Sequence, residues 1–208
     1  MASSTVLEKY VRSPVPALPQ SQFPYYNEEL RKIEQALGGA YAAIRGTGPY
    51  IQMPFGTLMS TTDQTAASTT VAYPITYSVV GLSSGISYQS GSQIKVAHDG
   101  VYNIQFSLQF VNTSNEPQEI DVWVRKNGVN IENSNSVFAV PFKKNSGILG
   151  HLIGSLNMFV DILSTDYVEL VWRTSSLAVS IEALPARTSP TIPLTPSVIV
   201  TLDYLSGL

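Results

Sequence analysis

The sequence predicts a mainly β protein: an antiparallel jelly-roll sandwich preceded by an extended N-terminal arm and one short helix. Three observations support this fold class. Apolar and polar residues alternate with a period of two over roughly eight short segments beyond residue 70, which is the pattern of half-buried strands. Prolines are concentrated between residues 14 and 24, and the one stretch with helical periodicity follows them. The chain of 208 residues is long enough to give one such domain its own core.

Residues 1–26 are predicted to form the extended arm. Proline fixes its own φ and disfavours helix at the preceding residue, so a proline-dense segment is extended and has no strand partners of its own. Such a stiff segment loses little entropy when it lies along a partner surface, which suits it to anchoring. The predicted anchoring residues are Pro14, Pro16, Pro19, Phe23, Pro24, Tyr25 and Tyr26.

A short helix is predicted over residues 27–45. Asn27 can cap its N-terminus, and the acidic side chains of Glu28 and Glu29 favour its first turn. Apolar residues then recur at alternating intervals of three and four, which is the spacing of a coiled-coil seam. An amphipathic helix packed on its own domain fits the same pattern, and both interpretations stay open at this point. The apolar positions are Leu30, Ile33, Leu37, Ala40 and Ile44.

Residues 46–70 are predicted to be a linker, because Gly, Thr, Ser and Ala predominate there, and residues 71–208 to form the sandwich. The alternation is clearest over residues 101–111, where one face is apolar and the other polar. Asn127-Gly128 predicts a tight hairpin turn, and the proline-rich segment Pro185–Pro196 a long ordered loop. The other predicted strands cover residues 71–80, 93–96, 120–125, 156–163, 167–173, 177–183 and 197–205.

Composition excludes several classes of function. The chain has no cysteine, so thiol catalysis, thiolate metal sites and disulfides are absent. A net charge of −3 with only 13% charged residues gives no broad basic surface for nucleic acid. The first residues lack the unbroken apolar run of a signal peptide, and no apolar stretch is long enough to span a bilayer. We therefore expect a soluble protein that the usual signal does not export and that binds neither nucleic acid nor a membrane.

The motifs that resemble active sites lack the context that catalysis requires. Gly81–Gly85 matches the nucleophile-elbow pattern around Ser83, but a strand-like segment follows it where a hydrolase needs a helix. His98 and His151 have no metal ligands at suitable spacing. We predict no enzymatic activity and no cofactor. The carboxylates that cluster in the sequence are predicted to be solvated strand ends: Glu116, Glu119 and Asp121, then Asp161, Asp166 and Glu169.

Several segments of the predicted sandwich resemble a known family. Residues 94–96 and 99–107 resemble the core strand of tumour-necrosis-factor-like and complement globular-head jelly rolls. Residues 122–128 look like the following hairpin in bacteriophage versions of that fold, and 156–171 like a later strand pair. Thr165 stands where the family usually has glycine. The last strand, 197–205, lies near a trimer axis in such proteins.

Residues 25–33 resemble a segment near the start of short phage structural proteins. Together with the arm and the jelly roll, this resemblance implies a bacteriophage virion protein: a homotrimeric fibre or knob made in the host cytoplasm and carried on the virion surface. The 1–26 arm would bind capsid or tail proteins, and the knob would serve in host attachment or head decoration. A trimer would make Leu30, Ile33, Leu37 and Ile44 its seam. The alternative is a lectin-like module for a host cell-surface glycan, using Tyr88, Tyr204 and the outer loops 113–118 and 185–196.

Overall fold

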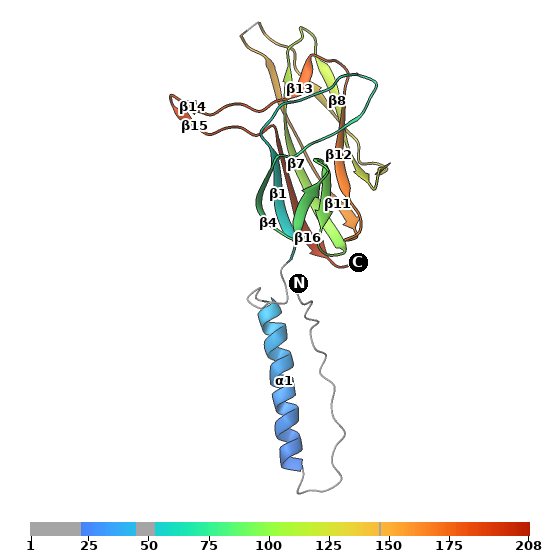
Figure 1. Cartoon of the computed structure of the whole chain (residues 1–208), viewed down its shortest axis with the longest axis vertical. Helices are drawn as coiled ribbons and strands as arrows, with labels where there is room; N and C mark the ends of the chain where they lie inside the picture. The colour runs from blue at the N-terminus through green and yellow to red at the C-terminus, as the bar shows by residue number, and fades with distance from the viewer. Residues whose placement is uncertain (1–21, 45–52, 146) are drawn as a thin grey trace. The chain divides into compact units, whose positions relative to one another are not determined.

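The computed structural model describes residues 22–44, 53–145 and 147–208 (Figure 1). The chain divides into two compact units, Met1–Gln52 and Met53–Leu208. The first contains the helix α1 (Gln22–Ile44), and the second contains all the strands. The predicted fold class is confirmed: a mainly β chain, with two antiparallel sheets forming a sandwich after one N-terminal helix.

The helix α1 begins at Gln22, so the prediction that the extended arm continues to residue 26 is wrong. Pro24 is compatible with this position because the first backbone N–H groups of a helix have no intrahelical partner. Asn27 is consequently an interior residue and not the cap. Glu28 lies beyond the first turn and pairs with Arg31 at 2.7 Å, which holds the pKa of the Glu28 carboxyl below its usual value. Pro14, Pro16 and Pro19 lie outside the described residues.

The first sheet of the sandwich, sheet A, is built around the long strand β7. β11 pairs with β7 over its whole length, while β16 and β13 pair with successive parts of it. β1 lies between β16 and β4, and β2 lies beside β13. The bounds are β1 (Phe55–Ser60), β2 (Gln64–Thr65), β4 (Val79–Ser84), β7 (Gly100–Asn112), β11 (Gly150–Ile162), β13 (Val179–Ile181) and β16 (Val198–Ser206).

The second sheet, sheet B, has the order β5, β6, β12, β8, β10. The short strands β3 and β9 add to β12 and β8, respectively. A separate two-stranded ribbon is formed by β14 (Arg187–Thr188) and β15 (Thr191–Ile192). The bounds in sheet B are β3 (Tyr73–Pro74), β5 (Ile86–Gln89), β6 (Gln93–Val96), β8 (Gln118–Lys126), β9 (Val129–Asn130), β10 (Ser136–Val140) and β12 (Val168–Thr174).

The core lies between the two sheets, and the alternation predicted on residues 101–111 is confirmed. From sheet A, Tyr102, Phe106 and Phe110 are almost fully buried, and Trp172 meets the core from sheet B. Each such side chain contributes on the order of 2 kcal/mol through removal of apolar surface from water. The single contiguous cluster that results fixes which face of each sheet points outward.

The sandwich begins earlier than predicted, because β1 and β2 lie inside the expected 46–70 linker. The predicted 71–80 strand is instead divided between β3 and β4. β11 also begins well before residue 156, running through Gly154, where a Cβ atom would collide with the Phe110 ring. The Asn127-Gly128 turn is confirmed, since both residues have positive φ, 52° and 82°, between the paired strands β8 and β9. The predicted loop 185–196 contains the β14–β15 ribbon.

Candidate subunit interface

The side of sheet A that faces away from the core forms a continuous surface, which we call the A outer face. Strand registers align its outward residues in rows from β1 through β16 and β7 to β11. One row is Phe55, Asp203, Asn103 and Phe159; the next is Thr57, Thr201, Gln105 and Asn157; the third is Met59, Ile199, Ser107 and Ser155.

The A outer face is poor in charge. The outward positions of β1, β7, β11 and β16, all within the described residues, include no lysine or arginine. Their carboxylates are Asp203 and Asp161, and Asp161 pairs with Lys126 at 2.9 Å. The remaining outward residues are apolar or carry amide and hydroxyl groups, apart from the imidazole of His151 on β11. Depletion of charge of this kind is typical of the centre of a protein–protein interface.

Exposed apolar side chains gather on β11, an edge strand of sheet A. Phe159 is 68% exposed and Ile153 is 59% exposed on its outer side. Leu156, on the opposite side of the strand, is also exposed although it pairs with buried Phe106. A long edge strand with exposed apolar residues is a site where another chain can associate, and folded proteins normally cover it or add charges.

The opposite edge of sheet A, β4, exposes Val80 and Leu82. A head-to-tail assembly would cover an apolar patch at each edge of the same sheet, with the β11 side of one copy against the β4 side of the next. Such a contact joins two different surfaces and closes into a ring when the rotation between copies allows it.

The outward side of sheet B, which we call the B outer face, differs from the A outer face. Arg125 pairs with Glu169 at 2.9 Å, and Arg173 with Asp121 at 2.8 Å. In both pairs the two residues lie directly opposite each other on β8 and β12. Charged pairs at such positions are compatible with water and stabilise the strand pairing. The B outer face therefore carries paired charges, one pair with a buried carboxylate and the other exposed, where the A outer face has mostly uncharged groups.

The predicted helix seam is partly described. Leu30 and Leu37 are 63% and 64% exposed, and Ile33 is half-buried. The side chain of Ile44 lies outside the description, as do those of Tyr41 and Phe23. Leu30 and Leu37 are thus exposed on α1, and their contact with other copies stays a prediction.

Gly81–Gly85 lies on a strand–turn–strand unit, β4 to β5, with Gly85 at φ 70°. The Ser83 hydroxyl donates to the backbone oxygen of Ile86 at 2.5 Å. A nucleophile elbow needs a strand followed by a helix, so the local context that hydrolysis requires is missing here.

The histidines lie apart from any cluster of metal ligands. His98 is exposed, and Nδ1 of His151 lies 3.7 Å from an oxygen of Glu182. Over the residues that the structure describes, no three His, Cys, Asp or Glu side chains are grouped so that they could hold a metal ion.

Two of the clustered carboxylates are buried, so the prediction that all of them are solvated strand ends is wrong. Glu169 accepts hydrogen bonds from the Ser92 hydroxyl at 2.7 Å and from Arg125 Nε at 3.0 Å. Asp166 accepts from Asn127 Nδ2 at 2.6 Å and from the Leu163 backbone N–H at 3.0 Å. These bonds hold the pKa of Asp166 below its usual value. Sequence alone gives no signal for either set, because Ser92, Arg125 and Asn127 belong to segments distant from the carboxylates that they contact.

The tyrosines that favoured a glycan site belong to aromatic pairs. Tyr88 packs against buried Tyr77 with ring centroids 5.7 Å apart, and Tyr204 against Tyr102 at 5.5 Å. Burial raises the pKa of Tyr77, and it raises that of Tyr102 to about 12. Both candidates are half-buried, and the lectin-like alternative stays a prediction.

Among the described helical residues, none forms a segment long and apolar enough to cross a membrane. A comparison with protein-family models finds no match for this sequence, and none of the curated proteins matches it.

Proposed function

We propose that the protein is a non-enzymatic structural protein of a bacteriophage virion, a homotrimeric short fibre or knob attached to the capsid or tail by its N-terminal segment. The observation that carries the proposal is the A outer face, which has apolar and uncharged polar side chains where the B outer face has ion pairs. A surface of this composition is stable when copies of the chain bury it against one another.

The order of the strands supports the resemblance to tumour-necrosis-factor-like jelly rolls. The last strand, β16, lies in sheet A between β1 and β7, with its outward residues on the A outer face. In that family the last strand lies near the three-fold axis. A trimer that follows this arrangement turns the A outer face of each copy toward the axis and leaves the B outer face in water.

The helix offers a second contact between copies. Three helices side by side would bury Leu30 and Leu37, which are exposed on one chain. Two heptads are too few to hold a trimer alone, but they add to a contact already made by the sandwich. The residues before the helix would then supply three copies of the anchoring segment to the virion surface.

The mass of the full chain in solution tests the trimer. Light scattering should give three times the chain mass of 22.6 kDa. A double variant Leu30→Asp/Leu37→Asp should weaken the trimer, whereas Gln35→Asp, at an exposed polar position of the same helix, should not. A monomeric wild-type chain contradicts the proposal.

The virion role is tested on particles of a phage that encodes the protein. Mass spectrometry of purified virions should detect it, and a chain that begins at Met53 should be lost from the particles although its sandwich is complete. Particles that lack the wild-type protein overturn the virion assignment. Adsorption of particles with and without the protein to host cells then separates host attachment from decoration.

A further inference from the structure

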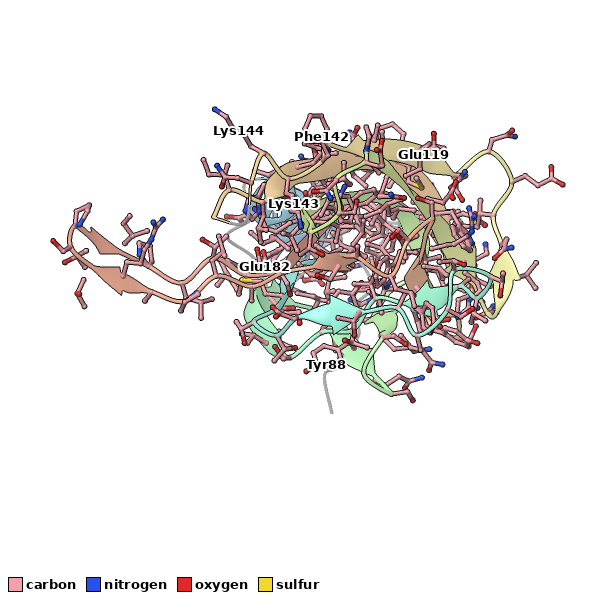
Figure 2. The ribbon with its side chains drawn as sticks, turned by 90° about the horizontal axis from the view of Figure 1, so that it is seen from above. Tyr88, Glu119, Phe142, Lys143, Lys144 and Glu182 are labelled. Carbon is pink, nitrogen blue, oxygen red and sulfur yellow. The ribbon has the colours of Figure 1, made fainter. Side chains whose placement is uncertain are left out.

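The β14–β15 ribbon projects from the sandwich. Figure 1 shows it extending away from β8 and β12 of sheet B, and Figure 2 shows it clear of the sandwich, with Glu182 labelled at its root. Leu184 and Thr195 join its two arms through reciprocal backbone hydrogen bonds of 2.9 Å. At the root, the Glu182 N–H donates to the Gln109 oxygen on β7 at 2.8 Å. The ribbon thus begins at sheet A and extends away from the body of the sandwich.

Within its own chain, this ribbon has little to hold it in place. None of residues 184–195 is buried, and Leu184 and Leu194 are exposed apolar residues on its two arms. An isolated two-stranded hairpin is at best marginally stable in water, because ordering each residue costs roughly 1–2 kcal/mol of backbone entropy. An ordered projecting ribbon with apolar side chains is therefore best suited to docking on another protein surface.

The composition of the ribbon matches the A outer face. Arg187 is the one charged residue between positions 183 and 196, and no ion pair of its guanidinium occurs among the described contacts. The A outer face has no lysine or arginine at its outward positions, Asp161 there is paired with Lys126, and Asp203 is exposed. Apolar residues and prolines of the ribbon complement the mostly uncharged surface, and its single positive charge complements the exposed carboxylate of Asp203.

We propose that the β14–β15 ribbon docks on the A outer face of a second copy of the chain, so that neighbouring subunits exchange arms. The ribbon emerges beside β16, which contributes to the A outer face itself, so the docked arm continues the proposed subunit interface. This inference rests on the proposed oligomer but goes beyond it, because it assigns the ribbon to a neighbouring subunit.

Photo-crosslinking tests where the ribbon lies. The chain contains no cysteine, so Thr191→Cys introduces a single attachment point near the ribbon tip for a maleimide–benzophenone label. In the purified full-length oligomer we expect covalent dimers and trimers on a denaturing gel, with crosslinked peptides from β1, β7, β11 or β16. The matched control is Val129→Cys, an exposed residue next to the hairpin turn between β8 and β9 in sheet B, which should yield monomers only.

Two substitutions measure the contact independently of the label. Arg187→Glu and Leu194→Asp should each raise the dissociation constant of the oligomer at least tenfold, and circular dichroism should be unchanged because neither side chain is in the core. An oligomer of unchanged affinity whose Thr191 label reacts only within its own chain overturns this inference and leaves the proposed function intact. A monomeric wild-type chain overturns both. A Thr191 label that crosslinks only to other proteins, in purified virions, also overturns it and assigns the ribbon to a different partner.

Discussion

The two outer faces of the sandwich are built on sheets of the same kind and differ in chemistry. On the B outer face, Arg125 and Arg173 are each paired with a carboxylate on the neighbouring strand. On the A outer face, Gln105, Ser107 and Thr201 occupy the corresponding outward positions. Both sheets are antiparallel and both bury their inner side in one core, so the fold does not require this difference. The difference indicates that the two faces meet different surroundings.

Solubility alone does not explain an uncharged face. An exposed strand edge with little charge, such as β11, is prone to uncontrolled pairing, and monomeric proteins protect it with lysine or proline. Here the edge instead presents Ile153, Leu156 and Phe159. The comparison therefore predicts that an added charge dissociates the oligomer when it lies on the A outer face and leaves the oligomer intact when it lies on the B outer face.

The largest effect is expected from a charge at the centre of the A outer face. Thr201→Arg places a guanidinium in the row with Thr57 and Gln105. A charge buried without a partner costs about 3 kcal/mol or more, and symmetry repeats that cost in every copy. Light scattering should report monomers. Circular dichroism should report an unchanged fold, because Thr201 points away from the core.

The matched control is Val137→Arg on the B outer face. Val137 is 57% exposed and lies opposite Asp121 on the neighbouring strand. This variant should keep the mass of the wild-type oligomer. If both variants remain oligomeric, the A outer face is not the interface.

The next effect concerns the buried carboxylate of sheet B. Glu169→Ala removes the acceptor of both Ser92 and Arg125. Water still reaches part of Arg125, so we expect the free energy of unfolding to fall by about 2–3 kcal/mol, below the full cost of an unpaired buried charge. Urea unfolding of Glu169→Ala in the monomeric Thr201→Arg background measures this change in the free energy of unfolding, because dissociation of the oligomer then does not contribute. Glu132→Ala, at an exposed position, should change stability by less than about 0.5 kcal/mol, and an equal loss in both variants contradicts this role for Glu169.

Much of the fold could be predicted because some signals are local. The burial of β7 alternates from Gly100 to Phe110 as the polar and apolar residues do, and Asn127-Gly128 favours a tight turn through its two residues alone. β1 was missed because Phe55–Ser60 contains Gly, Thr and Ser within a segment of similar composition. The start of α1 was missed because Pro24 ordinarily opposes helix but is accepted in a first turn.

The candidate interface could not be predicted because it depends on long-range pairing. Each strand shows only its own alternation of polar and apolar residues. The A outer face exists because Met59 pairs with Ile199, and Ile199 with Ser107, across large separations in sequence. The sequence already shows that the polar residues of β7 are amides and hydroxyls and that several of those of β8 are charged. Only the structure shows that these residues lie on the outer faces of two different sheets.

A smaller effect should appear in acid. Hydrogen bonds from Asn127 and from the Leu163 N–H favour the ionised form of Asp166 and lower its pKa in the folded state. The folded state therefore takes up this proton at lower pH than the unfolded chain does. The stability that Asp166 contributes is present above about pH 4 and is lost as the pH falls through the folded-state pKa.

Thermal unfolding of wild type and Asp166→Asn between about pH 6 and pH 3 measures this contribution. The wild type should be more stable at the upper end, and the difference should shrink toward the lower end as Asp166 becomes protonated. A difference in stability between the two proteins that stays constant with pH would contradict this contribution of the Asp166 carboxylate. Asp99, whose pKa is lowered by the Ser164 N–H, contributes to the residual acid dependence of both.

The smallest effect is expected at the exposed ion pair of the B outer face. Asp121→Asn removes the charge that faces Arg173 but keeps an oxygen that can accept its hydrogen bond. Exposed pairs of this kind contribute about 0.5 kcal/mol, and about 1 M salt should remove most of the difference between variant and wild type. The oligomer mass should not change, because this pair faces water in the proposed trimer. Dissociation of the Asp121→Asn protein at low salt would place the B outer face in a subunit contact, and the contrast between the two faces would then have to be explained by two different interfaces.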